Sequence, residues 1–409
     1  MKYNTITLRN GLRIIHLPSS SPVVYCGYEV NAGTRNETLD EEGIAHFCEH
    51  LTFKGTKRRK SYHINNCLEA VGGDLNAFTS KEDTVYYAAV LKEHLARAVD
   101  LLTDIVFHST YPQNEIDKEV EVVCEEIQSY KDSPAELIYD DFENIIFKGH
   151  PLGHNILGKA EQLRTYKSSH ALSFTGRYYH PENSIFFVYG DATFSRIVKL
   201  LEKATSDFPV SFPILNKLQP IELPEYKPQH IVIDKNTHQA HVMIGTRGYD
   251  IKDPKRIALY LMNNILGGPG MNARFSISLR EHHGLVYSVE SSMISYSDTG
   301  VWCTYFGCDP KDVDKCLKLI RKELDRLIDS PITDYQFRAA KKQIKGQIGV
   351  ACDNNESFAL DFGKSFLHYG WEKDITSLFR RIDELTPALL QEVAREIFDT
   401  DVLTTLIYK

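Results

Sequence analysis

The stretch GIAHFCEHLTFKGT, residues 43–56, places His46, Glu49 and His50 within five positions. On a helix, positions four apart lie on one face, so the two imidazoles can reach the same zinc ion. Glu49 lies beside them on that face and is free to act as a base rather than as a ligand. The spacing predicts a catalytic zinc site. The alternative is an exposed helix that carries two unremarkable histidines.

The helix that must present these residues is expected to be amphipathic. Its apolar positions repeat as i, i+3, i+4 and i+7, which is typical of a core-facing stripe: Ile44, Phe47, Cys48 and Leu51. We therefore interpret Cys48 as a packing residue and not as a ligand. Phe53 continues the opposite, zinc-facing side, where it could line the pocket beside the cleaved bond.

A catalytic zinc ion needs a third protein ligand, which leaves the fourth position for water. The run NEIDKEVEVVCEEIQSYK predicts an acidic helix, with an apolar stripe formed by Ile116, Val120, Val123, Ile127 and Tyr130. Glu119 and Glu126 lie at the margin of this stripe, where an acid is costly unless it is paired or bound to metal. Glu125 falls on the opposite, solvated face. A glutamate-rich surface helix without metal remains the alternative at this point.

The whole chain sets wider limits on function. A net charge of −8 over 409 residues argues against a nucleic-acid partner, and no apolar run approaches the ~18 residues of a membrane span. Asn10-Gly11, between two β-rich runs, predicts a hairpin turn rather than a secretory signal. The eight cysteines include no CxxC pair, which favours reduced thiols. We expect a cytoplasmic protein.

A proline-rich segment divides the chain. Residues 208–228 show no helical periodicity and are predicted to be an extended linker between a zinc-binding domain, 1–207, and a second domain, 229–409. Each part opens and ends on strand-like runs with long amphipathic helices between them. We therefore predict an α+β protein of two homologous domains, each an antiparallel sheet flanked by helices.

The two parts resemble each other most where YYAAVLKEHLARAVDLLTDI and the acidic helix match YFGCDPKDVDKCLKLIRKELDRLI and its following helix. The second part has no His-x-x-Glu-His. Where the first part has acids, its matching helix carries basic and amide residues instead: Lys341, Lys342, Gln343 and Lys345. Because only one copy holds the metal-type residues, we interpret them as more than scaffold.

The HFCEH motif with its later acidic helix resembles the pitrilysin-type zinc metallopeptidases, the inverted zincins. This family includes the mitochondrial processing peptidases, the insulin-degrading enzymes and bacterial relatives, and the length and layout are most similar to processing-peptidase-like bacterial members. The resemblance extends over nearly the whole chain. It includes the segments GGDLNAFTSKEDTVYYAAVL, GHPLGHNILG, RYYHPENSIFFVYGD and MNARFSISLREHHGLVYSVESS.

The resemblance implies roles for particular residues. It makes His46, His50 and Glu126 the ligands of one zinc ion per chain and Glu49 the base. Glu119 matches a second family acid that supports the site. The implied activity is a zinc-dependent endopeptidase.

The family pattern also implies how substrate is held. Extended or unfolded peptides are expected to add as a β-strand at DLNAFTS inside an enclosed chamber, where Asn76 and Ala77 contact the substrate backbone and the developing oxyanion. Arg280 and Tyr287 match family residues that reach the substrate or the oxyanion across that chamber.

Assembly follows from the same resemblance. Family members of this length form half of a clamshell, so we expect a homodimer, or a heterodimer with an inactive homologue. Neither nucleic acid nor membrane is expected as a partner. The rival interpretations are a non-catalytic assembly or chaperone-like subunit and a binding protein with a structural zinc ion.

Overall fold

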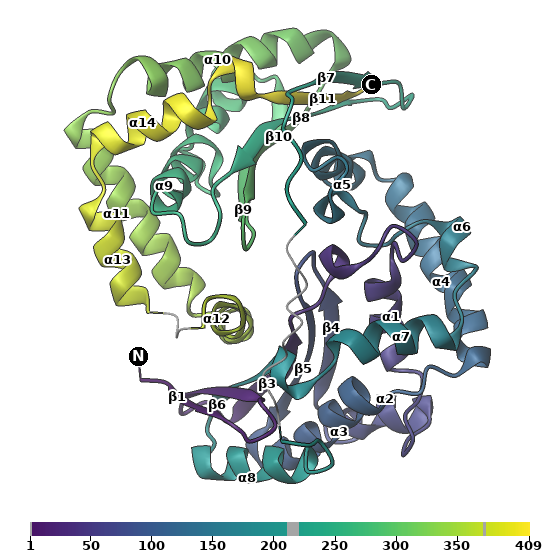
Figure 1. The fold of residues 1–409 in the computed structure, drawn as a ribbon. Helices are drawn as coiled ribbons and strands as arrows, with labels where there is room; N and C mark the ends of the chain where they lie inside the picture. The colour runs from purple at the N-terminus through teal and green to yellow at the C-terminus, as the bar shows by residue number, and fades with distance from the viewer. Residues whose placement is uncertain (1, 211–220, 371–373) are drawn as a thin grey trace. The chain divides into compact units, whose positions relative to one another are not determined.

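The computed structural model describes residues 2–210, 221–370 and 374–409. The chain divides into two compact units. Each unit combines helices with one β-sheet, which confirms the predicted α+β class (Figure 1). Unit 1 consists of Met1–Gln128, His154–Glu222 and Ala351–Lys373, and unit 2 of Ser129–Gly153, Leu223–Val350 and Asp374–Lys409.

The sheet of unit 1 has six strands. Their spatial order is β1 (Asn4–Thr7), β2 (Arg13–Pro18), β6 (Ser184–Gly190), β3 (Val23–Val30), β5 (Thr84–Leu91) and β4 (Asp74–Thr79). β1 and β2 pair antiparallel across the predicted hairpin turn, where Gly11 has a φ of +86°. β4 is an edge strand and pairs only with β5.

The sheet of unit 2 repeats this order without the first strand. It runs β7 (His230–Ile233), β11 (Thr404–Tyr408), β8 (Ala240–Gly248), β10 (Gly300–Cys308) and β9 (Val286–Ser295). The shared order supports the predicted duplication. The expectation of purely antiparallel sheets is wrong, because β2 pairs parallel with β6 and β7 pairs parallel with β11. In each unit the parallel partner is the last strand along the chain.

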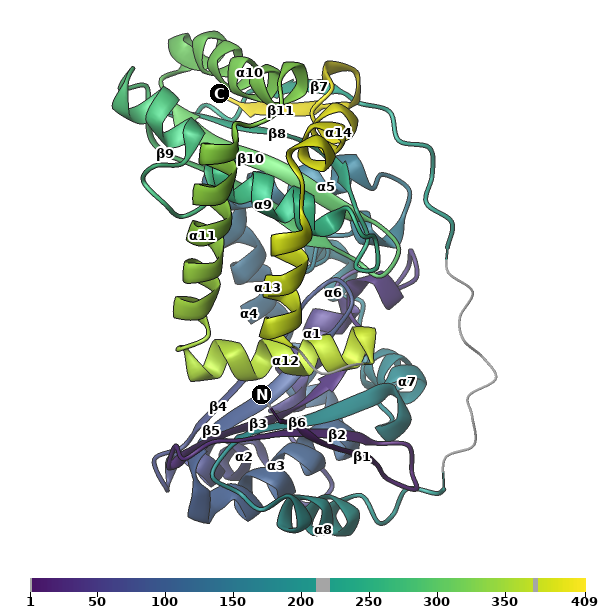
Figure 2. The ribbon, with the colours of Figure 1, turned by 90° about the vertical axis from the view of Figure 1, so that its left-hand side faces the viewer.

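Helices cover both faces of the unit 1 sheet. α3 packs on β3 and β5, and α12 packs on the opposite face against β3 and β6 (Figure 2). β3 is consequently almost entirely buried, which explains its nearly continuous apolar sequence. The helices of unit 1 are α1 (Ile44–Thr52), α2 (Ser61–Glu69), α3 (Leu95–His108), α4 (Gln113–Lys131), α6 (Ala160–Leu163), α7 (Ser168–Tyr178), α8 (Phe194–Ala204) and α12 (Asn355–Tyr369). The boundary of unit 1 falls within α4, after Gln128.

Unit 2 contains a helix that comes from the first part of the chain. α5 packs on β8, β10 and β11, and α9 packs on β9. The helices of unit 2 are α5 (Pro134–Ile146), α9 (Arg256–Gly267), α10 (Val313–Asp329), α11 (Asp334–Ala351), α13 (Ile375–Glu384) and α14 (Pro387–Ile397), with a π-helical turn over Ser276–Glu281. The boundary of unit 2 falls at the end of α11, after Val350.

The compact units differ from the predicted sequence division by one exchange. α5 lies in unit 2 although it precedes the predicted linker, and α12 lies in unit 1 although it follows the linker. Each amphipathic helix buries its apolar side on the sheet of the other part of the chain. Residues 211–220 of the predicted linker lie outside the described residues.

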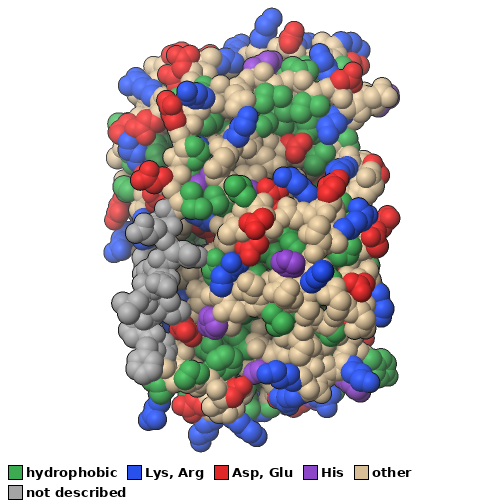
Figure 3. Space-filling model, turned by 45° about the vertical axis from the view of Figure 1, so that its right-hand side comes forward, with side chains coloured by type: hydrophobic (Ala, Val, Ile, Leu, Met, Phe, Trp, Pro, Cys, Tyr) green, Lys and Arg blue, Asp and Glu red, His purple; other side chains and the backbone are tan. Residues whose placement is uncertain are grey.

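One face of the surface carries charges of both signs. On the face drawn in Figure 3, Lys and Arg side chains lie interspersed with Asp and Glu. Within the described residues, none of the helices has the length and apolar character needed to cross a bilayer.

Candidate metal centre

α1 carries the two histidines and the glutamate of the motif, and an irregular turn fixes its start. Gly43 has a φ of +86°, in the left-handed region that glycine adopts without strain. The Glu37 carboxylate accepts hydrogen bonds from the N–H groups of Gly43 and Ala45, at 3.0 and 2.9 Å. The first N–H groups of a helix have no partner within it, so Glu37 anchors the turn that precedes the motif.

Both sides of α1 are buried. Phe47 and Cys48 are fully buried, as the predicted core stripe requires, and Cys48 is a packing residue. The side that carries the motif is also closed, with His46 only 7% and Glu49 8% exposed. Polar groups at such depth need partners, so the motif does not lie on an exposed helix.

α4 supplies the predicted acids. Its stripe is buried through Ile127, but Tyr130 is 37% exposed, because it lies beyond Gln128, where the chain leaves unit 1. Glu126 is half-buried beside α1, whereas Glu125 is exposed, as its predicted helix face requires.

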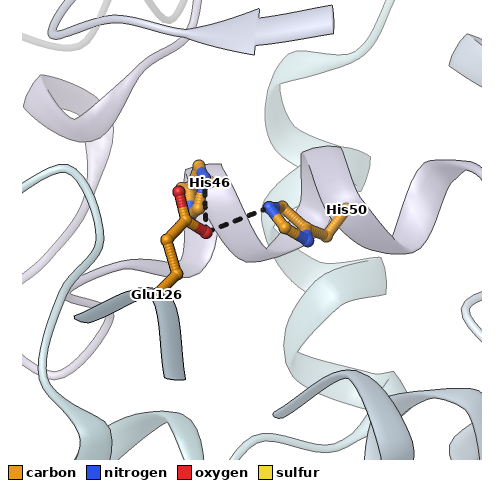
Figure 4. Close-up of side chains that lie close together, drawn as sticks. All are labelled: His46, His50 and Glu126. Carbon is orange, nitrogen blue, oxygen red and sulfur yellow. Dashed lines mark ion pairs between the residues drawn. The ribbon is translucent and has the colours of Figure 1, made fainter. Parts of the chain in front are cut away.

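The two helices bring three ligand-type side chains together (Figure 4). Oε2 of Glu126 lies 3.9 Å from Nε2 of His46 and 3.5 Å from Nε2 of His50. Their candidate ligand atoms all lie within 4.8 Å of one another. Among the described residues this is the only group of three or more metal-type side chains with such spacing.

Glu119 contacts His50 through Nδ1, the ring nitrogen that does not face Glu126. Its Oε1 lies 3.0 Å from Nδ1 of His50, and its Oε2 lies 2.6 Å from Nζ of Lys54. Burial alone would raise the pKa of Glu119, but the hydrogen bonds from His50 and Lys54 outweigh it and lower the pKa. The carboxylate is therefore charged and accepts the proton of Nδ1, which leaves Nε2 free to face Glu126.

The donor set fits a zinc ion. Burial, together with the neighbouring His50, lowers the pKa of His46 to about 3, so its imidazole is neutral, as a ligand must be. Burial also lowers the pKa of His50, but the hydrogen bond to Glu119 and the nearby Glu49 and Glu126 outweigh it and raise the pKa, so a metal ion would have to displace a proton from this imidazole. Two imidazole nitrogens and one carboxylate match the three-ligand sites of zinc hydrolases.

The predicted base lies next to these ligands. Burial raises the pKa of Glu49, and a hydrogen bond from Thr79 partly offsets this effect. The Thr79 hydroxyl donates to Oε2 of Glu49 at 2.6 Å. Glu49 is thus a buried carboxylate with one oxygen already occupied.

The three predicted substrate-binding residues lie close to α1 in unit 1. Asn76 is exposed on β4, and Ala77 is half-buried on the other side of that strand. Phe53, at the end of α1, is half-buried against the core, 6.3 Å from the Tyr86 ring between centroids. Their predicted contacts with substrate remain predictions.

Arg280 and Tyr287 belong to unit 2. Arg280 lies in the π-helical turn, 3.5 Å from Glu281, and Tyr287 lies on β9 with 87% of its surface exposed. Their role in catalysis remains a prediction.

Sequence reasoning missed three residues that support the site: Thr79, Lys54 and Glu37. The alternation of β4 could have identified Thr79, which lies on the same side as Ala77. Helical spacing could have suggested Lys54, which is four residues beyond His50. No periodic signal identifies Glu37, because the turn before Gly43 is irregular.

Two family models match the chain. The model described as insulinase, peptidase family M16, matches residues 14–160. The model described as the peptidase M16 inactive domain matches residues 169–344. The first match therefore contains α1 and α4, and the second contains most of the described part of unit 2.

Relatives resemble the chain along nearly its full length. A Bacillus subtilis protein, "Uncharacterized zinc protease YmxG", is 33% identical over 98% of this chain and 97% of its own. An uncharacterised zinc protease of Streptomyces coelicolor is 32% identical over 96% and 86%.

Solved structures share the fold. The crystal structure of a protease from Helicobacter pylori has a TM-score of 0.89 at 24% identity, covering 100% of this chain and 99% of its own. A structure from Pseudomonas fluorescens, titled as a peptidase M16 inactive domain, has a TM-score of 0.91 at 19% identity and covers 100% and 98%.

Proposed function

The chain belongs to peptidase family M16, and on that premise we propose that it is a zinc-dependent endopeptidase acting on extended or unfolded peptides. The observation that carries the proposal is the meeting of His46, His50 and Glu126 beside the buried carboxylate of Glu49. All four residues lie within the matched segment 14–160.

His46, His50 and Glu126 would hold the zinc ion, while Glu119 keeps His50 in the tautomer that leaves Nε2 free. When bound there, the ion would supply a Lewis acid that polarises a carbonyl group and makes water more acidic. Glu119 would thus act on the ligand His50 and not on the substrate.

Glu49 would perform the proton transfers. One carboxylate oxygen takes a proton from the attacking water, and the same proton then passes to the nitrogen of the leaving amine. Because burial raises the pKa of Glu49, its protonated form is stable enough to exist between the two transfers.

Substrate would bind as an added strand on β4. An edge strand offers unpaired N–H and C=O groups, and β4 ends at Thr79, whose hydroxyl touches Glu49. A peptide paired with β4 would therefore run past the base. Asn76 and Ala77, in the middle of β4, are the residues that it would contact.

The substitution Glu49→Gln tests the mechanism. It preserves shape and removes the base, so the variant should bind zinc as the wild type does and lose turnover by about 10²–10⁴-fold. Zinc content by elemental analysis and cleavage of an unstructured peptide, with and without chelator, are the measurements. Wild-type turnover by the zinc-loaded variant would refute the mechanism.

The same assay distinguishes the alternative of a non-catalytic assembly or chaperone-like subunit. Such a subunit would bind peptide without chelator-sensitive cleavage. The presence of all four residues in one site, with His46 and Glu49 buried, favours the enzyme. Homodimer formation and a cytoplasmic location remain predictions.

A further inference from the structure

Thr79 makes the shortest polar contact to the proposed base. It is the last residue of β4, and its hydroxyl donates to Oε2 of Glu49 at 2.6 Å. Glu49 is only 8% exposed, so this hydroxyl replaces a contact that water would otherwise make. A hydrogen bond to a charged acceptor is roughly twice as strong as one between neutral groups.

The strand itself aims this hydroxyl. Side chains of β4 alternate, so Leu75, Ala77 and Thr79 are half-buried on the side next to α1, while the residues between them are exposed. Thr79 pairs with Thr84 of β5 at the end of the ladder, which fixes its backbone. The hydroxyl is therefore held by the sheet and does not depend on a flexible side chain.

One hydroxyl proton can occupy only one carboxylate oxygen. With Oε2 of Glu49 accepting from Thr79, the other oxygen, Oε1, is left to receive the proton of the attacking water. A carboxylate held in this way cannot rotate freely between its two oxygens, so the reactive oxygen keeps its direction through the reaction.

We propose that Thr79 is a positioning residue for the base: its hydroxyl holds Oε2 of Glu49 and so directs Oε1 towards the attacking water. This inference rests on the proposed function.

The variants Thr79→Val and Thr79→Ser test the proposal. Valine has the shape of threonine but no hydroxyl, so kcat should fall by about 10–100-fold, a range typical of lost supporting contacts, with KM and zinc content unchanged. Serine restores the hydroxyl and should recover at least a third of the wild-type kcat. Titration with a zinc-binding dye gives a readout that does not depend on turnover.

Thr84→Val is the matched control. It makes the same change at the paired position of the ladder, where the hydroxyl donates to the backbone oxygen of Ala32 and not to Glu49. It should lower thermal stability without lowering the kcat of the folded enzyme.

The outcomes separate the two proposals. Wild-type kcat in Thr79→Val, or a loss of kcat that serine fails to restore, overturns the role of Thr79 while an inactive Glu49→Gln leaves the proposed function standing. Loss of zinc in Thr79→Val in step with kcat also overturns it, because the residue would then be structural. An active Glu49→Gln overturns both.

Discussion

The two units share a strand order, and in each unit a helix forms a hydrogen bond with an edge strand. Among the described residues, only unit 1 holds a cluster of metal-type side chains. In unit 1, Glu49 of α1 accepts a hydrogen bond from Thr79 of β4. In unit 2, the Asn263 amide of α9 donates to the backbone oxygen of Ser291 on β9, at 3.1 Å. The fold supplies the contact in both. The type of residue decides whether it can do proton chemistry.

The second helix shows the same contrast with the charge reversed. α4 presents Glu119 and Glu126 to α1. α11 presents lysines, and Lys341 and Lys345 bind Asp383 of α13 through its backbone and side-chain oxygens. In unit 1, Glu126 faces the two histidines and Glu119 supports His50, whereas in unit 2 the two lysines of α11 bind Asp383.

The largest expected effect of this contrast is on how far zinc binding protects backbone amides from hydrogen exchange. Zinc at a hundred times its Kd stabilises a native state by about 2.7 kcal/mol, so amide hydrogen exchange in α1 and α4 should slow by up to ~100-fold when zinc is added. α9 and α11 should show no change. Peptide-resolved hydrogen exchange by mass spectrometry measures both units in one sample.

A neighbouring pair of variants provides the control. Glu126→Ala should abolish the zinc-dependent protection, whereas Glu125→Ala, on the exposed side of α4, should retain it. Protection of α9 that equals that of α1 would show that the two units are not distinguished by metal.

A smaller effect is expected from Lys54, whose ammonium group pairs with Glu119. Lys54→Met removes the cation 2.6 Å from Glu119 and should weaken the hold of that carboxylate on His50. Supporting contacts of this kind change metal affinity by ~10–100-fold, and the indirect action of Lys54 places it near 10-fold. Competition with a chromogenic chelator measures the affinity.

Lys57→Met is the matched variant, since Lys57 is exposed three residues later. Its zinc affinity should equal that of the wild type. Equal affinities in both variants would mean that Glu119 needs no counter-charge to hold His50.

Local periodicity predicted much of the site. The helical repeat placed Phe47 and Cys48 in the core and separated Glu126 from the exposed Glu125. It did not reveal that the opposite side of α1 is also covered, because a helical pattern describes one helix and not its neighbours. Thr79 lies on a different element, so its contact with the base depends on tertiary packing.

The sequence alone could not predict which distant segments pair or pack together. The parallel pairing of β2 with β6 joins strands more than a hundred residues apart, and no alternation of residue types specifies a partner. The division of the chain at the linker gave no sign that α5 and α12 each lie on the sheet of the other part of the chain.

The exchanged helices are themselves held differently. In unit 2, the carboxylates of α5 accept from tyrosine hydroxyls, as Asp141 does from Tyr408. In unit 1, Lys364 and His368 of α12 bind Asp83 at 3.0 and 2.8 Å. Burial raises the pKa of Asp83, but these two partners outweigh it and lower the pKa. The contact of α12 therefore includes two ion pairs with a buried carboxylate.

We expect Glu29 to make the stability of unit 1 depend on pH. It is fully buried, neither carboxylate oxygen has a hydrogen-bond partner among the described residues, and an added Cβ at Gly363 would collide with it. Burial and the nearby Asp83 raise its pKa, and Lys364 offsets this only in part. A raised pKa in the folded state means that stability is fully present below the ordinary value of 4.5 and is lost as the pH rises through the folded value.

Glu29→Gln removes the charge that causes this loss of stability. An uncharged amide costs less to bury than a carboxylate, so the variant should be about 1–3 kcal/mol more stable at pH 8, with the difference shrinking towards pH 4. The melting temperature should rise by a few degrees at pH 8. Glu93→Gln, at an exposed position, should match the wild type at every pH. A gain in melting temperature that is the same at pH 4 and pH 8 would show that Glu29 destabilises unit 1 by its packing and not by its charge.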